Sequence, residues 1–167
     1  MFASGLHPER EKPWRVAIDH PKQDANRTFI ATLPLQNQGL ASSGNYRKFR
    51  TDASGKRYVH TVNPKTGETV QSNVLSTSVL APSTMLADAY ATALMAMPYE
   101  QGKTLISNLS TIEAIWVLAV NDSVQVVATP GLLTILSRAH TRGMYSSLSL
   151  HSAIFRLRKV ISKLYFA

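Results

Sequence analysis

Two oxygen-bearing side chains lie four residues apart in a run of helix-forming residues. Asp88 and Thr92 belong to the segment Thr84–Met97, which is predicted to be a helix with Ser83 as its N-cap. Residues spaced i and i+4 share one face of a helix, so the carboxylate and the hydroxyl would lie side by side. Such hard oxygens are the ligands that Mg²⁺ or Ca²⁺ prefers. The alternative is a solvated Asp88 with Thr92 bonded back to its own helix.

The surroundings of Asp88 bear on this choice. The rest of the predicted helix is almost wholly apolar, which predicts that it is buried. A carboxylate in a buried helix needs a compensating partner, because burying an unpaired charge is costly. A metal ion is one such partner.

His60 is the second candidate, and it precedes the polar segment Thr61–Gly67. A neutral imidazole can accept a proton from an attacking hydroxyl near pH 7 when the chain holds it within hydrogen-bonding reach. The alternative is a surface or structural histidine.

The third candidate is the string Ser42–Tyr46, predicted to be a tight turn between two strands. Gly44 permits close backbone approach, and successive amides there would face an anion. The alternative is an ordinary turn. The sequence contains none of the motifs GxGxxG, GxxxxGK[ST], HExxH or GxSxG. Spacing alone therefore leads no further than a metal and phosphate site.

Composition excludes several classes of protein. The chain has 167 residues, of which 44% are hydrophobic and 17% charged, so a packed core is expected and intrinsic disorder is not. The absence of cysteine excludes a disulfide scaffold, a thiolate metal site and a cysteine nucleophile. No apolar run has the length of a membrane-spanning helix, and Pro8, Glu9 and Glu11 lie where a signal peptide would carry its apolar core.

The net charge of +8 is concentrated at one end of the chain. Residues 123–167 carry six Lys or Arg and no Asp or Glu, so six of the eight net charges belong to them. Within this segment, apolar residues recur at helical spacing between Ser152 and Tyr165, which predicts a basic amphipathic helix. Such a helix suits contact with an anionic surface, against the alternative of a solvated or disordered end. No specific nucleic-acid partner is expected.

The elements that must position the candidates are mostly strands. Their apolar alternation and turn residues predict an α+β fold, with a mostly antiparallel sheet and the Thr84–Met97 helix buried against it. A second helix is predicted over Tyr99–Leu109, and the periodic pattern weakens beyond Gly131. Strands are predicted over Trp14–Ile18, Thr28–Leu33 (closed by Pro34), Leu40–Phe49 with its internal turn, Lys56–Val62, Ser76–Ala81, Ala114–Val120 and Val124–Thr129.

Three separate segments, in this order and spacing, give the sequence a family resemblance. They are Ser-Gly-Asn-Tyr at 43–46, Lys-Arg-Tyr-Val-His-Thr-Val-Asn-Pro-Lys-Thr-Gly at 56–67, and Ala-Pro-Ser-Thr-Met-Leu-Ala-Asp-Ala-Tyr-Ala-Thr-Ala-Leu at 81–94. Together they resemble the ApbE family of FAD:protein FMN transferases. The resemblance covers about residues 3–131 and corresponds to the C-terminal part of the family's catalytic domain, with roughly the N-terminal half missing.

The resemblance implies a Mg²⁺-dependent transfer of FMN from FAD to a threonine hydroxyl of an acceptor protein, with release of AMP. By the same match, Asp88 and Thr92 correspond to metal ligands, His60 to the base, and Val62, Ser43 and Gly44 to positions beside the flavin nucleotide. The implied partners are FAD and a subunit of a membrane redox complex.

The resemblance also divides the chain and locates the family. Residues 1–131 are expected to form the ApbE-like part and residues 132–167 a basic extension. Family members usually work as lipoproteins at the periplasmic face of the inner membrane; this sequence shows no such signal, so a cytoplasmic location is expected for the chain as given. Besides the transferase, two alternatives stay open: a truncated, inactive or merely nucleotide-binding remnant, and a binding module built on the basic helix.

Overall fold

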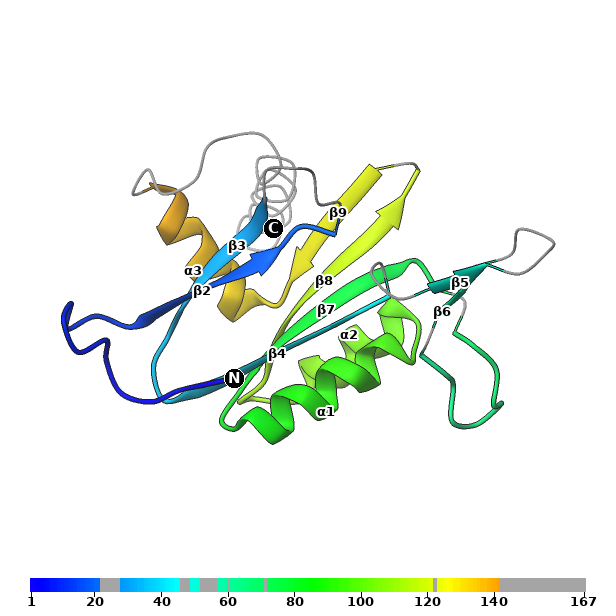
Figure 1. Ribbon diagram of the computed structural model, residues 1–167, viewed down its shortest axis with the longest axis horizontal. Helices are drawn as coiled ribbons and strands as arrows, with labels where there is room; N and C mark the ends of the chain where they lie inside the picture. Colours follow the sequence, from blue (N-terminus) through cyan, green and yellow to red (C-terminus); the bar gives the residue numbers. More distant parts are fainter. Residues whose placement is uncertain are drawn as a thin grey trace, which may run out of the picture.

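The computed structural model describes residues 1–21, 28–45, 49–51, 57–59, 61–70, 72–121 and 123–141. These residues form a central five-stranded antiparallel sheet with the order β1-β4-β7-β8-β9 (Figure 1). Its strands are β1 (Phe2–Ala3), β4 (Gln38–Gly44), β7 (Val74–Ala81), β8 (Glu113–Val120) and β9 (Ser123–Ala128).

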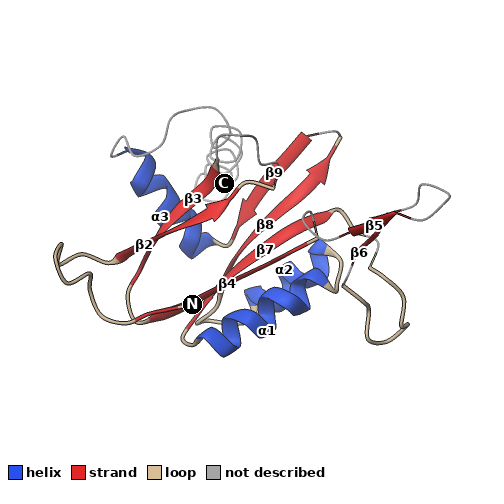
Figure 2. Ribbon diagram, in the orientation of Figure 1, coloured by secondary structure: helices blue, strands red, loops and turns tan. Residues whose placement is uncertain are grey.

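Different elements cover the two faces of this sheet. The helices α1 (Thr84–Met95) and α2 (Tyr99–Ser107) lie on one face, and the hairpin of β2 (Trp14–Asp19) with β3 (Phe29–Leu35) lies on the other, together with α3 (Pro130–Thr141) (Figure 2). A separate short hairpin pairs Phe49–Thr51 (β5) with Arg57–Val59 (β6). The predicted α+β class with a mostly antiparallel sheet is confirmed.

Side-chain alternation along the strands builds a separate apolar core on each face. On the α1 face, Val79 and Trp116 are almost completely buried against α1 and α2. On the opposite face, Ile115 and Val117 pack with Leu33 of β3 and Leu132 of α3. Both faces of the central strands are therefore covered, which explains the nearly continuous apolar run of β8.

Helix α1 begins as predicted, because the Ser83 hydroxyl accepts a hydrogen bond from the Leu86 amide at 3.2 Å. It ends at Met95, two residues before the predicted end. Strand β7 is linked to the middle of α1 by a buried hydrogen bond, in which the Thr77 hydroxyl donates to the Ala91 carbonyl at 2.8 Å. The predicted burial of this helix against the sheet is confirmed.

Two predictions of local structure were wrong, and tertiary pairing explains both. Ser42, Ser43 and Gly44 do not form a tight turn, because β4 runs through them and pairs with β7 as far as Gly44. Pro34 does not end its strand, since β3 continues to Leu35 and Pro34 lies opposite Arg15. Among the described residues β3 pairs only with β2, and a strand at the edge of a sheet tolerates a residue without an amide proton.

The chain after Gly131 is more regular than its pattern predicts. Helix α3 spans Pro130–Thr141, and Leu132 is only 1% exposed in the core below β3 and β8. The division of the chain at residue 131 stays a prediction, although α3 crosses it. The predicted basic helix between Ser152 and Tyr165 lies outside the described residues.

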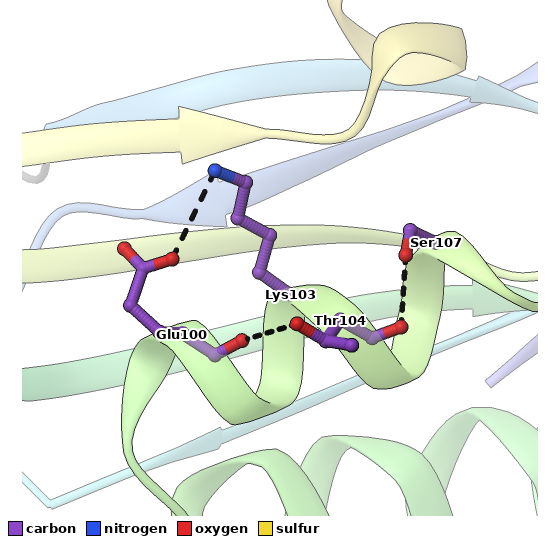
Figure 3. Close-up of polar contacts among 4 residues, drawn as sticks. All are labelled: Glu100, Lys103, Thr104 and Ser107. Atoms are coloured by element: carbon purple, nitrogen blue, oxygen red, sulfur yellow. Dashed lines mark hydrogen bonds and ion pairs between the residues drawn. The ribbon is translucent and has the colours of Figure 1, made fainter.

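The outward face of α2 satisfies its polar groups locally. Lys103 lies 3.9 Å from the Glu100 carboxylate, and the hydroxyls of Thr104 and Ser107 donate to carbonyls of the same helix at 2.9 Å and 2.8 Å (Figure 3). Burial, with a smaller contribution from the Glu100 charge, raises the pKa of Tyr99 at the start of this helix. Helix α2 ends at Ser107, two residues before its predicted end. Among the described helices none is long and apolar enough to cross a membrane.

Candidate functional site

The candidate site lies where the end of β4 meets the outer side of α1. The two elements are held very close at the start of the helix, because a Cβ atom on Gly39 would come within 2.5 Å of the Ser83 and Thr84 backbone. Thr77 fixes the middle of α1 by its hydrogen bond to Ala91. The position of α1 relative to β4 is therefore determined by backbone contact as well as by apolar packing.

Asp88 and Thr92 share one face of α1, as their spacing predicts. Both side chains are exposed, whereas Ala87, Ala91 and Leu94 on the opposite face are completely buried. The expectation of a buried Asp88 was wrong, since the sheet covers only one side of α1 and Asp88 lies on the other. The Asp88 carboxylate is therefore open to water. The cost of burying a charge gives no argument for a metal ion at this position.

Ser43 lies beside this face. Its hydroxyl oxygen lies 3.4 Å from that of Thr92, although 49 residues separate them in the sequence. Because side chains alternate along a strand, neighbouring Ser42 points to the opposite face, where its hydroxyl contacts that of Ser78 at 2.7 Å. Ser43 is thus the β4 side chain that contacts the helix face carrying Asp88 and Thr92. Gly44 follows it at the end of the strand.

The loop that carries the predicted base meets this end of β4 through Asn45. The Thr61 hydroxyl donates to the Asn45 side-chain oxygen at 2.9 Å, and the Asn45 amide donates to the Leu75 carbonyl at 3.0 Å. Asn45 is 9% exposed, so its end of this link is shielded from water, and the bond as a whole is partly buried. His60 itself lies outside the described residues, but its neighbour Thr61 is tied directly to the residue after Gly44.

Val62 and the turn after it complete this edge of the molecule. Val62 pairs with Thr69 and leaves 47% of its surface exposed. Between them, Gly67 adopts φ 73° and its amide donates to the Asn63 carbonyl at 2.9 Å, which closes a turn. The structure therefore brings Ser43 to Thr92 directly and links Val62 to Gly44 through their neighbours.

Asn45 and Thr61 are the residues of this site that sequence reasoning missed as a pair. Each lies inside one of the three segments that carry the family resemblance, next to a proposed site residue. Their places within these segments indicated that both residues lie near the site. No local pattern, however, predicts a hydrogen bond between two residues 16 positions apart.

The oxygen atoms at this site suit Mg²⁺ by type. Asp88 offers a carboxylate, and Thr92 and Ser43 offer hydroxyls. All three carry hard oxygen ligands. Within the described ranges no group of three or more His, Cys, Asp or Glu side chains lies close enough to hold a metal. The donor set fits a partial magnesium shell, of the kind that substrate phosphates and water complete.

Comparison with known proteins places this arrangement in a family. The profile of the ApbE family matches residues 1–116. A relative from Haemophilus influenzae, named FAD:protein FMN transferase, is 42% identical over 86 residues, which are 52% of this chain and 25% of the relative. One of the same name from Vibrio cholerae is 32% identical over 126 residues, or 75% of this chain and 37% of the relative.

A solved structure extends the similarity to the fold. The flavin transferase ApbE from Vibrio cholerae superposes with a TM-score of 0.66 and 31% sequence identity, over 79% of this chain and 40% of that one. The chain thus spans between a quarter and two fifths of the length of these relatives.

Proposed function

Because this chain belongs to the ApbE family, we propose that it provides the C-terminal part of an FAD:protein FMN transferase. The reaction is a phosphoryl-type transfer. A threonine oxygen of the acceptor attacks the phosphorus of the FMN half of FAD, the bond from that phosphorus to the bridging oxygen breaks, and AMP leaves with that oxygen. The threonine proton passes to a base, so the products are a phosphoester-linked FMN and AMP.

The observation that carries the proposal is the meeting of Ser43 with Thr92, beside Asp88 on the same helix face. These oxygens come from two of the three segments that give the resemblance, and Thr61 from the remaining one is bonded to Asn45 next to them. Sequence motifs that are far apart thus converge on one edge.

We assign the roles as follows. Asp88 and Thr92 would hold Mg²⁺, which when bound neutralises the pyrophosphate charge that shifts to the leaving AMP. Ser43 and Gly44 end β4 next to this position, where a hydroxyl and an open backbone suit contact with FAD phosphate oxygens. Exposed Val62 supplies an apolar surface beside the nucleotide.

The remaining role is that of the base. We assign to His60 the removal of the threonine proton, since an imidazole is the side chain whose ordinary pKa suits this task near neutral pH. The acceptor in this proposal is a subunit of a membrane redox complex, and the site of action is the periplasmic face of the membrane. Contact of the basic segment 152–165 with an anionic surface remains a separate prediction.

The transfer itself is tested by covalent labelling. The purified chain is incubated with FAD, Mg²⁺ and an acceptor subunit, alone and together with the part of the Vibrio cholerae relative that precedes the matched region. The mixture is then denatured and resolved on a gel. Flavin fluorescence that stays with the acceptor in either arm is the expected result. No labelled acceptor in both arms, while the complete relative labels it in parallel, would overturn the proposal.

That negative outcome would favour the second candidate, an inactive remnant that retains nucleotide contacts. The observation in its favour is the coverage of no more than two fifths of the structural relative. Titration of the chain with FAD then tests the remnant, which would bind the nucleotide in the same preparation that fails to transfer FMN.

The link between Asn45 and Thr61 gives a prediction about positioning. We expect Asn45→Ala and Thr61→Val each to lower the rate of flavin transfer by about tenfold, a size typical of one hydrogen bond that orients a reacting group. Because both changes break the same bond, the double variant should be no slower than either single variant. Transfer rates and melting temperatures of all four proteins measure this coupling. Additive losses in rate would show that the two residues act separately.

A further inference from the structure

One edge of the central sheet is paired along only part of its length. Strand β1 places Phe2 opposite Gly39, and Met1 exchanges two hydrogen bonds of 2.9 Å with Leu40. Strand β4 then continues to Gly44 along the same edge (Figure 1). Among the described residues no strand pairs with the outer edge of β4 between Ala41 and Gly44.

The backbone groups on this edge point in known directions. The N–H and C=O of Leu40 both face β1, so those of Ser42 and Gly44, two and four residues further, face the same side. The Asn45 amide donates in the opposite direction, to Leu75 next to β7, which agrees with this alternation. Ser42 and Gly44 therefore present two donors and two acceptors outward.

A hollow of about 290 Å³ lies directly beside this edge. Residues 17–19 of β2 border it on one side, and the ends of β4 and β7 on the other. The β4 and β7 residues that line it are serine and glycine, so their own side chains take up little of the space beside the open backbone. The lining residues on the sheet are Ser42, Ser43, Gly44, Ser76 and Ser78.

Exposed apolar side chains lie on the other face of this sheet edge, toward α1. Phe2 is 51% exposed opposite Gly39, whose backbone lies against the start of α1. Met85 in the first turn of α1 is 76% exposed, and it shares a helix face with Asp88 and Thr92. A free strand edge next to exposed apolar surface is typical of a surface that another segment covers.

From this geometry we infer that the outer edge of β4 binds an extended strand from the remaining part of an ApbE domain. The inference rests on the proposed function for the identity of the partner. The chain covers only 40% of the Vibrio cholerae structure, so most of such a domain lies outside the matched region. The strand runs antiparallel to β4, continues the line of β1 beyond Met1, and exchanges hydrogen-bonded pairs with Ser42 and Gly44.

The probe is a synthetic peptide of about ten residues, long enough for one strand. Its sequence is the segment that immediately precedes the matched region in the Vibrio cholerae relative. Binding to the 167-residue chain is measured by fluorescence anisotropy without FAD or metal, and hydrogen exchange locates it. We expect the Ser42 and Gly44 amides to become protected when the peptide binds.

A matched pair of variants tests the backbone contact. Ser42→Pro removes the outward N–H but leaves the ladder to β7 intact, because the Ser42 amide does not face β7. We expect it to weaken peptide binding by about tenfold or more. Ser42→Ala, which loses only the hydroxyl contact with Ser78, keeps the N–H and should bind as the unaltered chain does. Melting curves confirm that both variants are folded.

Several outcomes would overturn the inference: no peptide binding, equal binding by Ser42→Pro, or protection elsewhere than on β4. Light scattering that shows a dimer which Ser42→Pro dissociates would assign the edge to a second copy of the chain instead. Because these readouts involve no flavin, they separate the two proposals. Peptide binding without flavin transfer would support the β4 interface and reject the transferase. Flavin transfer without peptide binding would support the transferase and reject the interface.

Discussion

Replacing Asp88 by asparagine is expected to lower the rate of flavin transfer by about 100- to 1,000-fold, the usual cost of removing one electrostatic contact to a transferring phosphoryl group. The amide keeps the shape of the side chain but loses the negative charge that attracts Mg²⁺. Because Asp88 is exposed, we expect the free energy of unfolding to change by no more than about 0.5 kcal/mol. The gel assay and a thermal melt measure the two quantities.

The control for Asp88→Asn is the same chemical change on the neighbouring helix. Glu100 is an exposed carboxylate on α2 whose ion pair, among the described residues, is with Lys103 of the same helix (Figure 3). Glu100→Gln should therefore leave transfer unchanged. A magnesium titration adds a second readout, since Asp88→Asn should need a higher Mg²⁺ concentration for half-maximal rate. An unchanged titration curve would reject Asp88 as a metal ligand.

The second large effect is expected on stability. Gly39→Ala should lower the free energy of unfolding by about 3 kcal/mol, because overpacking against rigid atoms forces the backbone to move. The added Cβ would meet the Ser83 carbonyl carbon and the Thr84 nitrogen at 2.5 Å, and both belong to the backbone at the start of α1. Urea unfolding followed by circular dichroism measures the change.

Gly102→Ala is the matched comparison for this change. There the new Cβ would meet the end of the Leu94 side chain at 2.8 Å, which can rotate away, and alanine favours the α2 helix over glycine by up to about 1 kcal/mol. We therefore expect little net change in stability. Equal losses of stability in Gly39→Ala and Gly102→Ala would show that the backbone contact between β4 and α1 is no more rigid than the side-chain contact at Gly102. If Gly39→Ala also slows transfer, displacement of α1 from Ser43 is the physical reason.

Much of the local structure follows from the sequence. Ser83 and the helix formers after it predict the start of α1, and the i, i+4 spacing predicts that Asp88 and Thr92 share a face. The alternation of Trp14, Val16 and Ile18 predicts β2. These features depend on neighbours within a few residues, so the sequence contains the information directly. The family resemblance, now supported by the match over residues 1–116, also came from short local segments.

Other features were settled by contacts between distant residues. The serines of β4 suggest a turn locally, but pairing with β7 keeps them extended, since each strand satisfies the backbone groups of the other. The apolar composition of α1 suggests burial on all sides, but only one face meets the sheet, which leaves Asp88 in water. Leu132 gives α3 its place in the core, although the periodic pattern is weak there.

Local patterns in the sequence were therefore enough to predict the family, most element types and the residues offered for chemistry. The contact of Ser43 with Thr92, the hydrogen bond of Thr61 to Asn45 and, among the described residues, the unpaired outer edge of β4 became known from the folded chain. The difference lies in the range of the interactions. Propensity and capping act over a few residues, whereas strand pairing and packing join residues that the linear sequence separates by tens of positions.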